Sequence, residues 1–128
     1  MKLLLLVLAF IIPSETEYSP NLAAVTKAIS DGDAVALGNY IENTVEMTVL
    51  DKQDVYEKGQ AVQLLKDFFT KNKPKTFNPM HQGSSKGNAS HYTMGDLATS
   101  GGNFRVVIYY KASSGDKLTI QEMRIEKQ

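Results

Sequence analysis

The residues best suited to chemistry are two histidines, His81 and His91, and an aspartate, Asp96, in the second half of the chain. A polar turn at 83–88 separates the two histidines, and pairing of the strands on either side would bring the imidazoles together. Such a pair could transfer protons, or bind a metal ion with Asp96 as a third ligand. Two polar side chains on a half-exposed hairpin are the simpler interpretation, so we assign no catalytic residue and no metal ligand.

Aromatic residues form a second group, because phenol hydroxyls or rings inside a cavity could orient a ligand. The alternative is that the tyrosines are amphipathic residues whose hydroxyls reach the rim of a sheet. If the chain has a pocket, the residues that we expect to line it are Tyr40, Phe69, His81, His91, Tyr92 and Tyr109.

Several classes of protein are excluded or disfavoured by composition. The chain has no cysteine, which excludes disulfides, thiolate metal sites and a cysteine nucleophile. Fourteen basic and 14 acidic residues cancel, and the basic residues do not form a stripe, so we do not expect nucleic acid as a partner. No phosphate loop, zinc-protease motif or nucleophile elbow is present in the sequence, and we expect no cofactor.

The N-terminus has the pattern of a secretory signal peptide. Lys2 precedes an uninterrupted apolar run at 3–12, and Pro13 follows that run. The run is about half of the roughly 20 residues that a membrane-spanning helix needs. We therefore predict a signal peptide at 1–18, one domain at 19–128, and export to the periplasm or the medium with no stable membrane span after processing. A retained membrane anchor and an ordinary buried segment are the alternatives.

Three strands joined by tight turns are predicted at the C-terminal end of the chain. Their bounds are 89–99, 104–112 and 117–126, with turns at 100–103 and 113–116. The middle strand carries apolar side chains at both parities, which indicates a central strand. Helices on one side of the sheet can bury only one face of this strand, so another surface must bury the second apolar face.

Two irregularities are predicted within the strands. Apolar residues change parity between Ile120 and Met123, and one extra residue near 121–122 would return all of them to one face. Gly95 could mark a second bulge. Pro79 lies in a weaker strand at 76–82, which we place at an edge of the sheet or at a bulge, because proline cannot donate to a ladder.

The helices are predicted upstream. The residues at 58–72 carry an apolar stripe that ends in Phe68 and Phe69, which is typical of a helix lying across a sheet. Two short helices flank the turn at 31–33, and an alternating strand follows at 44–50. The fold class is therefore α+β: a curved, mostly antiparallel sheet of four to six strands that wraps one long and two short N-terminal helices as a cone.

This order of elements resembles the nuclear transport factor two-like fold, also called the cystatin-like α+β cone. The Asp31-Gly32-Asp33 turn and the Lys58-Gly59 step before the long helix carry the resemblance, which covers residues 19–127. The segments Phe77-Asn78-Pro79-Met80 and Gly95-Asp96 also resemble a family of small exported bacterial proteins of unknown function. The resemblance implies the shape and a tendency to dimerise. The catalytic sets of ketosteroid isomerase and scytalone dehydratase do not match here.

The leading functional hypothesis is a non-catalytic, exported binding or scaffold module that forms a homodimer through its sheet and could take a small apolar ligand. The alternative hypothesis is a small isomerase, dehydratase or cyclase that acts on an apolar ligand inside the cone.

Overall fold

The computed structural model describes residues 20–84, 90–112 and 118–128. The predicted signal peptide and the predicted turn at 113–116 lie outside these residues. The elements in chain order are α1 (Pro20–Asp31), α2 (Ala34–Gly38), β1 (Ile41–Val49), β2 (Lys52–Glu57), α3 (Lys58–Lys71), β3 (Pro74–Ser84), β4 (Ser90–Thr99), β5 (Gly102–Ala112) and β6 (Leu118–Lys127).

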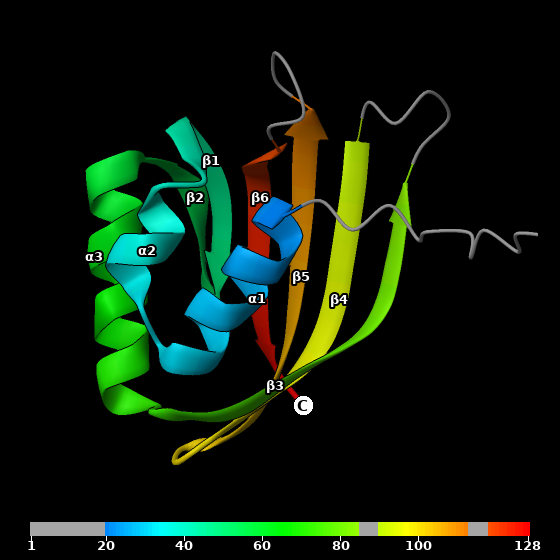
Figure 1. Cartoon of the computed structure of the whole chain (residues 1–128). Coiled ribbons are helices and arrows are strands. Elements are labelled where there is room, and N and C mark those ends of the chain that lie inside the picture. The colour runs from blue at the N-terminus through cyan, green and yellow to red at the C-terminus, as the bar shows by residue number, and fades with distance from the viewer. Residues whose placement is uncertain (1–19, 85–89, 113–117) are drawn as a thin grey trace, which may run out of the picture.

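All six strands form one curved, unclosed sheet in the order β2-β1-β6-β5-β4-β3 (Figure 1). β1 and β6 run parallel, and the other neighbours are antiparallel. The three helices lie on the concave side of this sheet. This arrangement confirms the predicted α+β cone and places β5 in the interior of the sheet, as predicted.

Local chemistry explains why the first two helices are separate. Gly32 has a φ of +67°, a left-handed conformation that suits glycine, and it ends α1. Asp33 then caps α2, because its carboxylate accepts a hydrogen bond from the Ala36 backbone N–H at 3.0 Å.

The core lies between α3 and the concave face of the sheet. Leu65 and Phe68 of α3 are buried, and the Phe68 ring meets the Phe104 ring of β5 edge to face, with centroids 5.0 Å apart. Alternate residues of β5 complete this surface, which confirms that the long helix covers the sheet. The buried residues of β5 are Phe104, Val106, Ile108 and Tyr110.

Two of the register shifts in the sheet bear on the residues that the sequence singled out. The pairing of β5 with β6 shifts where Tyr109 opposes Glu122 and Tyr110 opposes Ile120, so Gln121 is the extra residue. This bulge was predicted, and it keeps the apolar residues on both sides of it in the core. The core residues of β6 are Leu118, Ile120, Met123 and Ile125.

The second bulge lies on β3, an edge strand, and not on β4. Pro79 opposes Gly95 and His81 opposes Met94, which leaves Met80 as the extra residue. The placement of Pro79 at an edge bulge is confirmed. The expectation of a bulge at Gly95 is wrong, because β4 pairs with β5 without a shift.

Candidate functional site

The two histidines lie on opposite faces of the sheet, so the alternative in which their imidazoles form a pair is wrong. His81 opposes Met94, whereas His91 opposes Ser84. The bulge at Met80 is the cause, since one extra residue turns every later side chain of β3 to the other face. His81 is exposed on the convex face, and His91 is half-buried on the concave face.

Asp96 does not join either histidine in a metal site. Its carboxylate lies 3.9 Å from the Arg105 guanidinium and accepts a hydrogen bond from the Gln128 amide at 2.6 Å. Within 20–84, 90–112 and 118–128, no three histidine, aspartate or glutamate side chains gather in a way that could hold a metal ion.

The other predicted pocket residues separate into two groups. Tyr92 and Tyr109 oppose each other on the convex face and are 38% and 39% exposed, so they do not line the cone. Tyr40 and Phe69 lie on the helical side. Tyr40 is half-buried, and its carbonyl accepts a hydrogen bond from the Ile120 backbone N–H at 2.6 Å.

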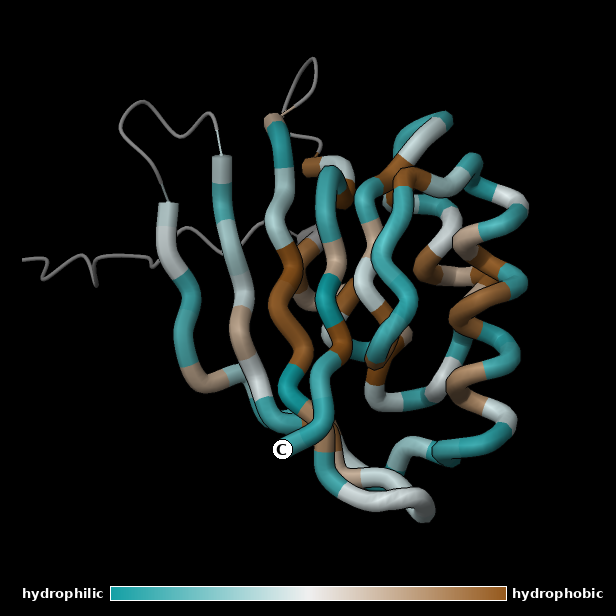
Figure 2. Tube along the Cα trace, turned by 180° about the vertical axis from the view of Figure 1, so that it is seen from behind, coloured by the Kyte–Doolittle hydropathy of each residue, from teal (hydrophilic) through white to brown (hydrophobic). Residues whose placement is uncertain are grey.

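Two aliphatic residues lie beside the two tyrosines on the convex face. Met94 opposes Val107 on the same two strands, and both are half-buried. We call Tyr92, Met94, Val107 and Tyr109 the convex patch. Figure 2 shows the chain trace from this side, with an apolar run in the middle of β5, of which Val106 and Ile108 are buried in the core and Val107 lies on the convex face.

An ion pair borders the convex patch on β6. Glu122 opposes Tyr109 and Arg124 opposes Val107, and the Arg124 guanidinium donates to the Glu122 carboxylate. This bond and the charge of Glu122 raise the pKa of Arg124 above its ordinary value. The patch therefore has an apolar centre and a charged border.

A polar group on the concave face was missed by the sequence analysis. Tyr110 opposes His91, and Thr93 is the next residue of β4 on the same face. Thr93 and Tyr110 are each 1% exposed, and their hydroxyl oxygens are buried. The Thr93 hydroxyl has no hydrogen-bond partner within the described part of the chain. The alternation of β4, with Gly95 and Leu97 facing inward, is the signal that could have found Thr93.

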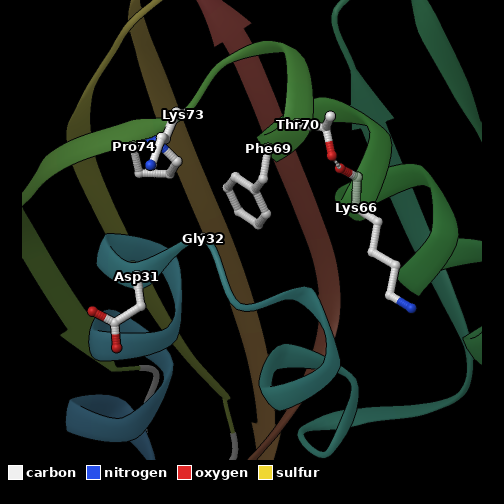
Figure 3. Close-up of a pocket in the computed structure, with 7 residues that line it drawn as sticks. All are labelled: Asp31, Gly32, Lys66, Phe69, Thr70, Lys73 and Pro74. Carbon is white, nitrogen blue, oxygen red and sulfur yellow. Dashed lines mark hydrogen bonds between the residues drawn. The ribbon is translucent and has the colours of Figure 1, made fainter.

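An open hollow of about 370 Å³ lies where α1 ends, α3 ends and β3 begins. Figure 3 shows the Phe69 ring pointing into this hollow between Lys73 on one side and Lys66 on the other, with the Lys66 side chain extending away from the ring. Asp31 lies on the rim, and its carboxylate is 2.6 Å from the Lys27 ammonium, which raises the pKa of Lys27. The full lining is Asp31, Gly32, Lys66, Phe69, Thr70, Lys73 and Pro74.

A family model described as a domain of unknown function, DUF4783, matches residues 22–126. The chain belongs to the DUF4783 family. A DUF4783 protein from Bacteroides ovatus is 33% identical, with a TM-score of 0.77, and the match covers 83% of this chain and 94% of that one. These findings confirm the predicted membership of a family of unknown function. No curated protein matches the chain.

More distant structures share only the fold with this DUF4783 domain. An NTF2-like protein from Cytophaga hutchinsonii is 10% identical, with a TM-score of 0.61, and the match covers 84% of this chain and 92% of that one. The epoxide hydrolase/cyclase-like enzyme SalBIII, described in pyran ring formation in salinomycin, is 15% identical, with a TM-score of 0.60 and coverages of 82% and 85%. The predicted nuclear transport factor two-like fold is thereby confirmed.

The DUF4783 domain offers three distinct surfaces: the convex patch, the polar group on the concave face, and the hollow beside α3. None of its helices within the described ranges is long and apolar enough to cross a membrane. These surfaces could bind a partner or a ligand through aromatic and aliphatic side chains, hydroxyl groups and ammonium groups.

Proposed function

We propose that this chain is an exported, non-catalytic binding module that associates with a second copy of itself through the convex patch. The observation that carries the proposal is the cross-strand pair Tyr92 and Tyr109, each more than a third exposed on two interior strands of the sheet. Aromatic residues flanked by half-buried aliphatic ones are the composition of interface centres.

The packing of the other face supports this choice of surface. On the concave side α3 packs over the sheet, and Leu97 and Ile108 are fully buried there. Among the described residues, no helix or strand packs against the convex side (Figure 1). An apolar area with no cover from its own chain is a typical place for a protein partner.

The charges around the convex patch favour a second copy over a strongly charged partner. Three basic and three acidic side chains lie on the convex face of β4, β5 and β6, so its net charge is zero. Two such faces can meet without net repulsion, as a twofold interface requires. The basic residues are Arg105, Lys111 and Arg124, and the acidic residues are Asp96, Glu122 and Glu126.

Sedimentation equilibrium of residues 19–128 tests the association. We expect a dimer at micromolar concentrations, and we expect Tyr109→Lys to be monomeric because it would place an ammonium group in the apolar contact. Lysine there faces Glu122, so the fold is retained. Val35→Lys is the matched control, since Val35 is 58% exposed on α2. A strictly monomeric parent chain, or a dimer that survives Tyr109→Lys, would contradict the proposal.

Export is a separate part of the proposal, and it is supported by the basic start and short apolar run at 2–12. Expression of the full chain in a bacterium, followed by fractionation and N-terminal sequencing, tests it. We expect soluble protein outside the cytoplasm that begins near residue 19. Protein that retains Met1 and stays with the membrane or the cytoplasm would argue against export.

The buried hydroxyl of Thr93 favours one second candidate function, a small isomerase, dehydratase or cyclase acting on an apolar ligand in the cone. A buried hydroxyl without a partner is unfavourable by about 1–3 kcal/mol, and a ligand oxygen could remove that penalty. His91 and Tyr110 lie on the same face of the sheet as Thr93. A crystal structure of residues 19–128 should then show ligand density within hydrogen-bond distance of Thr93 Oγ1, and its absence would remove this candidate.

A further inference from the structure

The hollow beside α3 has the size and the charge of a site for a small ligand. Its volume of about 370 Å³ falls near the lower end of the roughly 300–1,000 Å³ that ligand pockets occupy. It lies on the helical side of the sheet, away from the convex patch, so its use does not depend on self-association.

An apolar surface forms one part of the hollow. The Phe69 ring points into it and is 7% exposed, and Pro74 lies opposite the end of α1 (Figure 3). Gly32 permits this closeness, because a Cβ at Gly32 would lie 3.1 Å from Pro74 Cδ. The small exposed part of the ring and the half-buried proline can therefore contact the apolar body of a ligand.

Positive charge forms the other part. Lys66 and Lys73 are exposed, and neither has an ion-pair partner among the described residues. Asp31 is the only acidic residue of the lining, and it is already paired with Lys27. Lysine side chains are flexible, so both ammonium groups can turn toward one anion.

The partial negative charges at the C-terminal ends of α1 and α3 disfavour an anion in the hollow, but the charges of the two lysines are larger. α1 and α3 both end at the hollow, and each C-terminus carries a partial charge of about −0.5. The two ammonium groups exceed this sum. In addition, terminal carbonyls already have donors: Ile29 accepts from the Gly32 N–H, and Phe68 accepts from the Asn72 N–H.

We propose that this hollow binds a small organic acid, with the carboxylate between Lys66 and Lys73 and the apolar body against Phe69 and Pro74. The site is open to solvent, and the charge contacts are at the surface. The affinity therefore depends on both parts together, and neither a neutral analogue nor a simple anion should bind as well.

A titration with benzoate, followed by ¹H–¹⁵N NMR on residues 19–128, tests the proposal. Benzoate should shift the amide resonances of Lys66, Thr70 and Lys73. Benzyl alcohol, which lacks the charge, and inorganic phosphate, which lacks the ring, should each bind about tenfold more weakly or not at all. Equal affinity for phosphate and benzoate would mean attraction of anions only and would overturn the proposal.

Variants locate the effect. The double variant Lys66→Gln/Lys73→Gln should weaken benzoate binding about tenfold without changing the melting temperature. Lys58→Gln/Lys111→Gln is the matched control, because both lysines are exposed, one at the start of α3 and the other on the convex face of β5. Tyr109→Lys should bind benzoate normally, which separates this test from that of the convex patch. Unchanged binding by the first double variant would overturn the assignment.

Discussion

The ring of Phe77 lies over Gly95 on the neighbouring strand, so closely that a Cβ at Gly95 would be 2.7 Å from two ring carbons and 2.6 Å from the Asn78 carbonyl oxygen. This contact fills the concave face where β3 bends around the narrow end of the cone. A second pair has the same arrangement on the convex face, where the Tyr92 ring covers Gly83. At Gly95 a side chain is thus excluded by the neighbouring ring and backbone, and not by a positive φ.

Replacing Gly95 by alanine should therefore lower the free energy of unfolding by about 1–3 kcal/mol, because the ring and the Asn78 backbone must both move. The measurement is urea denaturation of residues 19–128 followed by circular dichroism. Gly59→Ala is the control: Gly59 lies in the first turn of α3, and a Cβ there would have no neighbouring atom within 4 Å, so alanine should stabilise by about 0.5–1 kcal/mol. Equal effects of the two substitutions would contradict the packing account.

Leu50 should be replaceable with a gain in stability. It has a φ of +56° in the turn between β1 and β2, and it is 44% exposed. A left-handed conformation is unfavourable for leucine and free for glycine, so Leu50→Gly should raise the free energy of unfolding by about 0.5–1 kcal/mol. Val55→Gly, at a 63% exposed position within β2, should lower it by a similar amount. A loss of stability in Leu50→Gly would show that the side chain contributes more than the turn conformation.

The cap of α2 gives a third prediction. The Asp33 carboxylate accepts from the Ala36 N–H, and Asp33→Ala should lower the free energy of unfolding by about 1 kcal/mol. Asn caps helices about as well as Asp, so Asp33→Asn should restore most of the loss. Thermal denaturation of the three proteins measures this, and failure of asparagine to rescue would indicate that the charge of Asp33, and not its hydrogen bond, matters.

Hydropathy patterns predicted the helices, the strands and one bulge. The reason is that the burial of apolar side chains determines both the period of each element and the position of that bulge. The parity change between Ile120 and Met123 was visible as sequence, and the structure places Gln121 out of register there. The bulge at Met80 has no change of parity to mark it, and only Pro79 indicated an edge or a bulge in this strand. This extra residue is the reason that His81 faces away from His91 and that the two imidazoles do not form a pair.

Surfaces formed by residues far apart in sequence could not be predicted either. Phe69 was expected at a pocket, but the cations beside it come from α3 and from the segment that enters β3, and Asp31 comes from α1. These residues come together only because α1 and α3 end at particular residues. A hydropathy pattern locates the end of a helix only to within a few residues. Tyr92 and Tyr109 were correctly placed on strands, but their common face follows from register alone.

Two buried threonines on the same face of β4 should respond in opposite ways to replacement by valine, which has nearly the same shape. The Thr99 hydroxyl donates to the Gly102 carbonyl at 2.8 Å and accepts from the Gly101 N–H at 3.1 Å, so Thr99→Val should lower the free energy of unfolding by about 1–2 kcal/mol. The Thr93 hydroxyl has no partner within the described residues, so Thr93→Val should raise that free energy by about 1 kcal/mol.

Urea denaturation of both variants, with the parent chain measured alongside, checks this difference in sign. The comparison is controlled internally, because the two positions are 1% and 6% exposed, and the same methyl group replaces the same hydroxyl. A destabilised Thr93→Val protein would mean that a bound molecule or a water satisfies the hydroxyl in solution. Unfolding and refolding the protein before the measurement would remove a bound small molecule but not a water. The stability that the parent chain owes to a bound ligand would then be lost, whereas the contribution of a water would remain.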